Sequence, residues 1–149
     1  MYKRILIFIL LAMVVVGCST SKSVIKPEDV DKIKIELRDL DETDKQLVYS
    51  LVLKNNSSHV IKQNSVYMGY EVKIDNGTKG SNFLFKAQGN KLDIQPNEEV
   101  GLTVLVPKDE LPSQEKFYKN ILSFEISGFL NEVKQENSFG KGQSININK

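Results

Sequence analysis

The chain has 149 residues, a length that favours a single domain. Its 20 Lys and Arg nearly balance 19 Asp and Glu, and the net charge of +1 without a basic block argues against a nucleic-acid-binding protein. A hydrophobic share of 40% is too high for a disordered chain and too low for a polytopic membrane protein. The single cysteine, Cys18, excludes an intrachain disulfide, so the fold must rest on its hydrophobic core.

The first predicted element is a secretory signal peptide in residues 1–17. Lys3 and Arg4 give a positively charged start, residues 5–16 are uninterruptedly apolar, and a small residue, Gly17, ends the run. A helix of about twelve residues spans ~18 Å, well short of the ~30 Å hydrocarbon core of a bilayer. The pattern therefore predicts a cleaved signal rather than a permanent transmembrane helix.

The end of this segment, Val15-Val16-Gly17-Cys18, resembles the lipobox of bacterial lipoproteins. The resemblance implies that the Cys18 thiol carries diacylglycerol, that the chain is cut between Gly17 and Cys18, and that the new amino group can be acylated. It also implies a lipid-anchored protein on the extracytoplasmic face of the cell membrane. Two acyl chains on one cysteine give durable retention, and the mature chain, with 18 basic and 19 acidic residues, gains no electrostatic pull toward anionic lipid.

Residues 18–31 are expected to be the lipidated cysteine and a flexible tether. The segment is polar and has no sustained hydrophobic period, and Pro27 is expected to break any helix there. A flexible chain of this length would hold the domain roughly 20 Å from the bilayer.

Residues 32–149 predict an all-β domain, because apolar residues alternate with polar ones at a period of two. Turn residues rich in Asn, Asp and Gly separate the runs, while residues 107–119 are the least strand-like and 112–115 are expected to begin one or two helical turns. The alternating sets are Ile33, Ile35 and Leu37; Leu47, Tyr49, Leu51 and Leu53; Val66, Met68, Tyr70, Val72 and Ile74; Val100, Leu102, Val104 and Val106; Leu122, Phe124 and Ile126; and Ile145 and Ile147.

Six or seven short strands in a domain of this size favour a single antiparallel β-sandwich. Residues 47–56 (LVYSLVLKNN) and 92–106 (LDIQPNEEVGLTVLV) resemble bacterial immunoglobulin-like domains, although the paired cysteines and core tryptophan of antibody domains are absent. The resemblance implies an immunoglobulin-like sandwich. The alternative is a small closed β-barrel.

The sequence contains no recognisable catalytic constellation. A Ser-His-acid triad would have to use the one histidine, His59, which follows a turn and is expected to be solvated, and there is no G-x-S-x-G motif. Clustered Cys and His ligands for zinc are also missing, and no cofactor is expected.

An acidic stretch between two predicted strands offers the one candidate metal site. Asp39, Asp41 and Asp44 would present hard oxygen ligands for weak calcium binding on a loop. The EF-hand pattern fails, however, because Asp44 stands where Gly is required and Ser50 where Glu is required. The alternative interpretation is a solvated acidic turn.

Together these features predict a non-catalytic binding or accessory module of the cell envelope. Its partners would be the membrane, through lipid on Cys18, and an envelope protein, a peptide or a wall polymer, with no nucleic acid. The alternatives are an inhibitor of an envelope or secreted protease, a small-ligand carrier, and a hydrolase that uses carboxylates alone.

Overall fold

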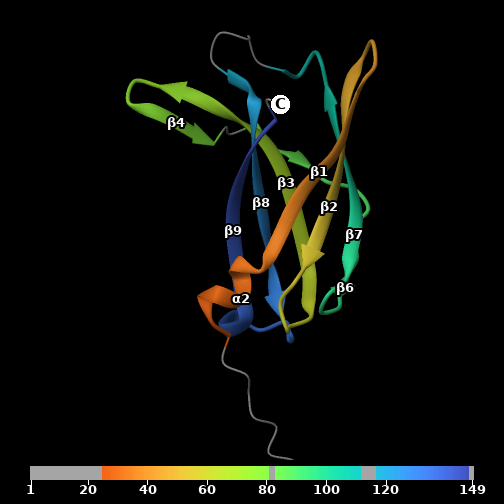
Figure 1. Cartoon of the computed structure of the whole chain (residues 1–149), viewed down its shortest axis with the longest axis vertical. Helices are drawn as coiled ribbons and strands as arrows, with labels where there is room; N and C mark the ends of the chain where they lie inside the picture. The colour runs from red at the N-terminus through yellow and green to blue at the C-terminus, as the bar shows by residue number, and fades with distance from the viewer. Residues whose placement is uncertain (1–24, 81–82, 112–116, 148–149) are drawn as a thin grey trace, which may run out of the picture.

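The computed structural model describes residues 25–80, 83–111 and 117–147. The predicted signal peptide, Gly17, Cys18 and the helical turns expected at 112–115 lie outside these residues. The elements in chain order are α2 (Pro27–Asp31), β1 (Ile33–Glu42), β2 (Gln46–Asn55), β3 (Ile61–Ile74), β4 (Gly77–Gly80), β5 (Phe85–Lys86), β6 (Asp93–Ile94), β7 (Glu99–Pro107), β8 (Phe117–Leu130), the 3₁₀ helix η3 (Gln135–Asn137) and β9 (Ser138–Asn146) (Figure 1).

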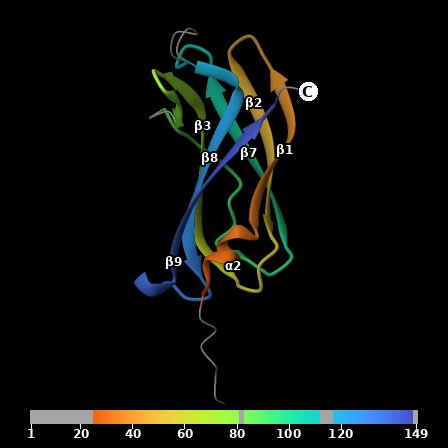
Figure 2. The ribbon, with the colours of Figure 1, turned by 60° about the vertical axis from the view of Figure 1, so that its left-hand side comes forward.

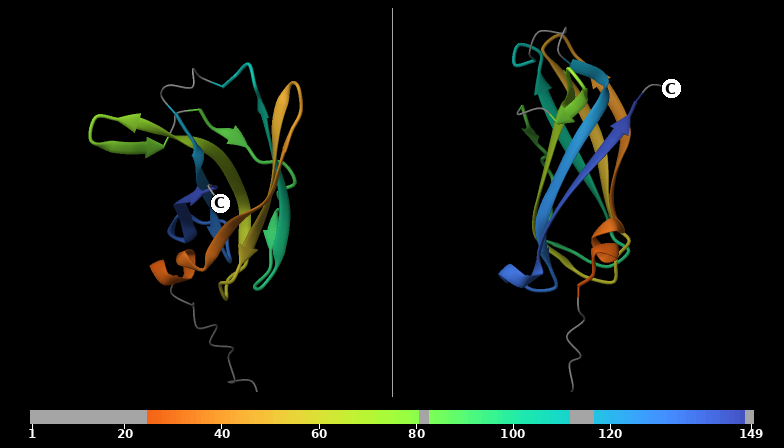
Figure 3. Two further views of the ribbon diagram at one scale, coloured as in Figure 1. Left: turned by 45° about the horizontal axis from the view of Figure 1, so that its top comes forward. Right: turned by 90° about the vertical axis from the view of Figure 1, so that its left-hand side faces the viewer.

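The strands form two antiparallel sheets that face each other. The smaller sheet has the order β1-β2-β7, and the larger has the order β4-β3-β8-β9, with β5 and β6 also pairing with β3. The larger sheet curls, so that the pair resembles a half-barrel (Figure 3, left). The prediction of an all-β antiparallel sandwich is confirmed.

The core lies between the sheets and is built from the alternating residues identified in the sequence. In the smaller sheet, Leu51 of β2 lies opposite Leu102 of β7, and both are almost fully buried. Burying a side chain of this kind contributes about 1.5–3 kcal/mol, so the two-residue period determines which face of each strand turns inward. The most deeply buried large side chains are Ile33, Ile35, Tyr49, Leu51, Leu53, Ile61, Val66, Met68, Ile94, Leu122, Phe124 and Leu130.

A tyrosine pair joins the two sheets inside the core. The hydroxyl groups of Tyr49 on β2 and Tyr70 on β3 lie 2.8 Å apart, and the rings meet edge to face with centroids 6.5 Å apart. Burial raises the pKa of both phenols, so each stays protonated and the hydroxyls satisfy one another. The pair supplies a directional contact inside a core that is otherwise built mainly from apolar side chains.

One open side of the sandwich is closed by the main chain. The segment after β5 leaves β3 and forms a two-residue bridge with β7, in which Gln88 and Thr103 exchange backbone hydrogen bonds of 2.8 and 3.0 Å. Gly89 follows with φ of +89°, and a Cβ at this position would lie 3.0 Å from the Gly101 carbonyl oxygen. A glycine is therefore required where the chain crosses from the larger sheet to the smaller one.

The other open side, between the edges of β1 and β9, is closed by side chains. The Gln143 amide of β9 donates to the Ile35 carbonyl at 2.6 Å and accepts from the Ile35 N–H at 3.2 Å, so it imitates the backbone of a paired strand. Two residues earlier, the Lys141 ammonium donates to the Ile33 carbonyl at 2.7 Å. Burial, together with the nearby Lys34 ammonium, lowers the pKa of Lys141. Figure 2 shows β9 running up beside β8 toward β1.

The segment that precedes β1 differs from the sequence-based expectation. Pro27 does not break a helix but begins α2, because the first turn needs no N–H from this residue and the proline ring presets a helical φ. The last five residues of the expected tether, 27–31, are therefore helical and belong to the folded domain. Within the described ranges, no helix is long and apolar enough to cross a membrane.

The start of β8 is the second difference. Residues 117 and 118 belong to the stretch 107–119 that was expected to be the least strand-like, yet they pair with β3, with Tyr118 opposite Glu71. The register shifts between Tyr70 and Glu71, and this irregularity breaks the alternation by which a strand is recognised in sequence.

We predict that Gln143→Ala destabilises the fold by about 1–3 kcal/mol, because the Ile35 N–H and carbonyl would lose their partner at a half-buried edge. Urea unfolding followed by circular dichroism measures the change. Gln135→Ala, at an exposed glutamine of η3, is the matched control and should change stability by less than about 0.5 kcal/mol. Equal stability of the two variants would contradict a role for Gln143 in closing this side.

Candidate functional site

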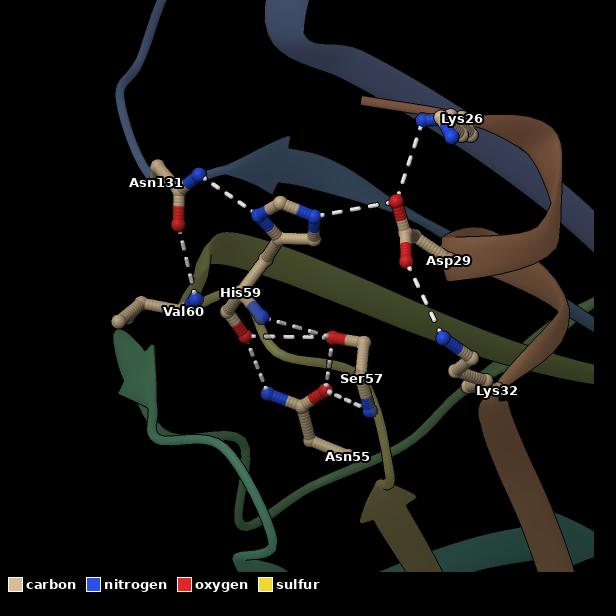
Figure 4. A network of polar contacts seen from close by, with 8 residues as sticks. All are labelled: Lys26, Asp29, Lys32, Asn55, Ser57, His59, Val60 and Asn131. Carbon is tan, nitrogen blue, oxygen red and sulfur yellow. Dashed lines mark hydrogen bonds and ion pairs between the residues drawn. The ribbon is translucent and has the colours of Figure 1, made fainter. Parts of the chain in front are cut away.

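The most elaborate polar arrangement lies at the end of the sandwich that carries α2. It is formed by the turn between β2 and β3, by α2, and by the residue that follows β8 (Figure 4). His59 belongs to this turn, and the prediction that it is solvated is wrong, because only 4% of its surface is exposed. It is buried because Asp29 of α2 and Asn131 after β8 contact its ring from two sides.

Asn55 is the central hydrogen-bonding residue of this arrangement. Its side chain is fully buried, and its amide nitrogen donates to the carbonyl oxygens of His59 at 2.7 Å and of Ile94 and Gln95, both at 3.1 Å. Its amide oxygen accepts from the N–H of Ser57 at 3.2 Å and from the Ser57 hydroxyl at 2.6 Å. A single side chain therefore links the turn after β2 to the turn before β7. Asparagine followed two residues later by serine is a turn signal that sequence analysis can detect.

The His59 ring is held between an amide and a carboxylate. Its Nδ1 lies 2.8 Å from the amide nitrogen of Asn131, and its Nε2 lies 3.1 Å from Oδ2 of Asp29. The amide oxygen of Asn131 accepts from the Val60 N–H at 3.1 Å, which fixes the amide so that its nitrogen faces the ring. Nδ1 must then accept, so in the neutral ring the proton lies on Nε2 and is donated to Asp29.

Asp29 has two further partners besides His59. The backbone N–H of Lys26 donates to its Oδ2 at 3.2 Å, and the Lys32 ammonium donates to its Oδ1 at 3.3 Å. The Lys26 N–H and, next, the His59 ring hold the pKa of this carboxyl below its ordinary value of 3.8. The carboxylate therefore caps the start of α2 and fastens the helix to the buried histidine.

Lys141 fastens the other end of α2. Its ammonium donates to the carbonyl oxygens of Val30 at 3.2 Å and Asp31 at 3.0 Å, in addition to that of Ile33. Carbonyl groups in the last turn of a helix have no partner inside the helix, and a cation there also complements the helix dipole. The short helix is thus held to β9 at one end and to the β2–β3 turn at the other.

This geometry supports anchoring rather than proton transfer. A histidine paired with a carboxylate also occurs in hydrolases, where the second ring nitrogen faces a nucleophile. Here the second nitrogen accepts from Asn131, and the Ser57 hydroxyl contacts Asn55 and the backbone of His59 rather than the ring. Both ring nitrogens of His59 are therefore occupied in holding α2 and the loop after β8.

The acidic stretch does not form the loop that was expected. Asp39 and Asp41 lie on β1, opposite Ser50 and Val48 of β2, and Asp44 lies in the short turn that joins the two strands. That turn closes through Thr43, whose hydroxyl donates to the Gln46 carbonyl at 3.0 Å. In the part of the chain that the structure describes, no three His, Cys, Asp or Glu residues come together as a group that could hold a metal ion.

Comparisons with known proteins yield structural likenesses and no sequence match. No protein-family model and no curated protein sequence matches the chain. Among solved structures, the chain is similar to the archaellum periplasmic stator protein FlaG from Sulfolobus acidocaldarius, at 12% sequence identity and a TM-score of 0.32, over 76% of this chain and 99% of that chain.

We predict that Asn55→Ala destabilises the protein by about 3 kcal/mol or more, because it removes the centre of a buried hydrogen-bond network and leaves several buried groups without partners. The neighbouring Asn56 is exposed, so Asn56→Ala is the matched control and should stay within about 0.5 kcal/mol of the wild type. Chemical unfolding of the two variants measures the difference, and a mild effect at Asn55 would count against its central role.

The depressed pKa of Asp29 gives a prediction for the dependence of stability on pH. Since the folded-state pKa is below the unfolded-state value near 3.8, ionised Asp29 stabilises the fold above that value. The contribution is lost as the pH falls through the folded-state pKa. Asp29→Asn should therefore lower the melting temperature at neutral pH, and the difference from the wild type should shrink as the pH falls below 3.8.

The control for this measurement is Asp44→Asn, at the opposite end of the sandwich. The melting temperature of Asp44→Asn should stay close to that of the wild type at every pH. A deficit of Asp29→Asn that persists unchanged in acid would show that the carboxylate charge is not what fastens α2.

Proposed function

We propose that this protein is a lipoprotein held at the extracytoplasmic face of the cell membrane by lipid on Cys18, and that its β-sandwich is a non-catalytic binding or accessory module of the cell envelope. The observation that carries the proposal is the sequence Val15-Val16-Gly17-Cys18 at the end of a positively charged and then apolar segment. Lipidation of the Cys18 thiol would then determine where in the cell the domain is held.

The way in which the chain enters the sandwich fits this proposal. Only residues 19–24 lie between Cys18 and Ile25, the first described residue, and Ile25 already packs against the core. Asp29 and Lys141 then hold α2 on the domain. A lipid on Cys18 would therefore retain a folded domain by one end, through a short connection.

The arrangement around His59 supports a binding module over an enzyme. His59 is the one histidine of the chain, and Cys18, the one cysteine, would carry the lipid. Since both ring nitrogens of His59 are occupied, neither is placed to activate a nucleophile. The strands and loops of the sandwich would then act by contact with an envelope protein, a peptide or a wall polymer.

Replacing the cysteine tests the anchor. In cells fed an alkyne analogue of palmitate, the wild type should take up label, and its intact mass should correspond to a chain that begins at Cys18 and carries diacylglycerol. Cys18→Ser should lose the label and retain residues 1–17, because the thiol that accepts the lipid is gone. Ser21→Ala, three residues beyond the cysteine, is the matched control and should be labelled and processed like the wild type.

A wild-type chain that keeps residues 1–17 with an unmodified Cys18 thiol would overturn the proposal. So would equal labelling of the wild type and Cys18→Ser, because lipid would then reside elsewhere.

A further inference from the structure

Most edges of the two sheets are protected against pairing with another chain. Proteins blunt exposed edges with bulges, charges, prolines or very short strands. The register of β1 shifts after Leu37, and its backbone binds side chains of β9. β7 ends in Pro107 and is bridged at Thr103, and β4 has only four residues. The remaining edge strand is β9, the last in the order β4-β3-β8-β9 (Figure 2).

The edge strand β9 lacks these protections. Its nine residues pair with β8 without a register shift and include no proline. Lys141 is its one charged residue, and the ammonium is bound to carbonyl groups of α2 and β1. The outer face of β9 carries short, uncharged side chains that are all exposed, Ser138, Gly140, Gly142, Ser144 and Asn146.

The backbone groups of alternate β9 residues point away from β8. Ile147 donates its N–H to the Asn120 carbonyl at 2.8 Å, so these two residues form a hydrogen-bonded pair. Bonded and non-bonded pairs alternate along an antiparallel ladder, which places Gly140, Gly142 and Ser144 in non-bonded pairs with β8. Their N–H and C=O groups therefore face the open edge, where no other strand of the described chain pairs with them.

The two glycines of this edge are not required by the fold of a single chain. A Cβ at Gly140 or Gly142 would meet no atom within 4 Å, whereas a Cβ at Gly128 of β8 would lie 3.0 Å from the Lys62 carbonyl oxygen. Glycine inside a strand costs about 0.5–1 kcal/mol relative to alanine, and it is typical of places where another backbone approaches closely. The edge of β9 is therefore suited to an incoming strand.

We propose that β9 pairs in antiparallel with β9 of a second copy of this chain, about a two-fold axis at Gly142, and so joins two larger sheets into one. This register overlaps all nine residues of the strand. Gly142 lies opposite Gly142 of the second copy, and Gly140 lies opposite Ser144. The backbone groups that face the open edge thus bind one another. The pairing does not depend on the lipid on Cys18.

The side chains of β9 are also self-complementary in this register. On the inner face, Lys141 lies opposite Gln143 of the second copy, and Phe139 lies opposite Ile145. A shift by two residues would place the two Lys141 side chains directly opposite each other, and like charges in that position are destabilising. An unrelated peptide fits less well, because side-chain pockets give an added strand its specificity, and the outer face offers it only glycine, serine and asparagine.

Disulfide crosslinking of the full-length protein tests the pairing and its register. In the proposed register, the Cα atoms of the two Gly142 residues lie about 5.5 Å apart, which a disulfide can span. Those of the two Gly140 residues lie about 14 Å apart, which it cannot span. Gly142→Cys should therefore crosslink to itself, and Gly140→Cys should crosslink only when mixed with Ser144→Cys. Gly101→Cys, at an exposed glycine of the edge strand β7, is the matched control.

The wild type, which contains Cys18 alone, is the blank for this experiment. We expect several-fold more crosslinked dimer above the blank for Gly142→Cys than for Gly140→Cys or Gly101→Cys. Equal crosslinking of the three variants, or no dimer above the blank for Gly142→Cys, would overturn the proposal.

Sedimentation velocity provides a second measurement without added cysteines, in detergent with micelles in excess over protein. Gly142→Pro should weaken the dimer about tenfold or more, because each copy loses an N–H donor at the shared edge while no bond to β8 is removed. Gly142→Ala is the matched control and should still dimerise, because its Cβ points to the open outer face. Circular dichroism establishes that both variants are folded. A monomeric wild type, or a dimer that a folded Gly142→Pro leaves unchanged, would contradict pairing through β9.

Discussion

The end of the sandwich that carries α2 depends on one buried amide, the side chain of Asn55. Asn55 has no access to water, so each of its hydrogen-bonding groups must find a partner within the protein, and these partners come from the turn it begins and from the turn before β7. Asn55 thus holds both turns, and its bond to the His59 carbonyl oxygen positions that residue. The ring nitrogens of His59 in turn contact Asp29 of α2 and Asn131, which follows β8. The attachment of the N-terminal segment is thus a consequence of satisfying one polar side chain.

The two sheets must also be held together without an intrachain disulfide, because the chain has one cysteine. Apolar burial and the Tyr49–Tyr70 pair act between the faces. The open sides are closed by different means. On one side the chain crosses between sheets at Gln88, and on the other the side chains of Lys141 and Gln143 bind the backbone of β1. Since exposed strand edges invite pairing with other chains, these contacts also protect the edges they cover.

The short helix α2 is held to the domain through both of its ends, by Asp29 and by Lys141. Lys141 contributes twice here, since the same ammonium binds the carbonyls of α2 and of β1. Closing the sandwich and fixing its N-terminal helix are therefore coupled through one side chain.

The sequence by itself determined the strands and their inward faces, because alternation is a local property that Leu51, Leu53, Leu102 and Val104 carry in their own segments. It also identified the turn after Asn55. It did not determine the burial of His59, the helix that begins at Pro27, or the roles of Lys141 and Gln143, and it assigned the acidic residues of β1 to a loop. Only the tertiary structure decided these, because His59 meets Asn131 across 72 positions and Lys141 meets Val30 across 111. Contacts between residues so far apart in the chain leave no periodic signal in either segment, and they exist only once both sheets have formed.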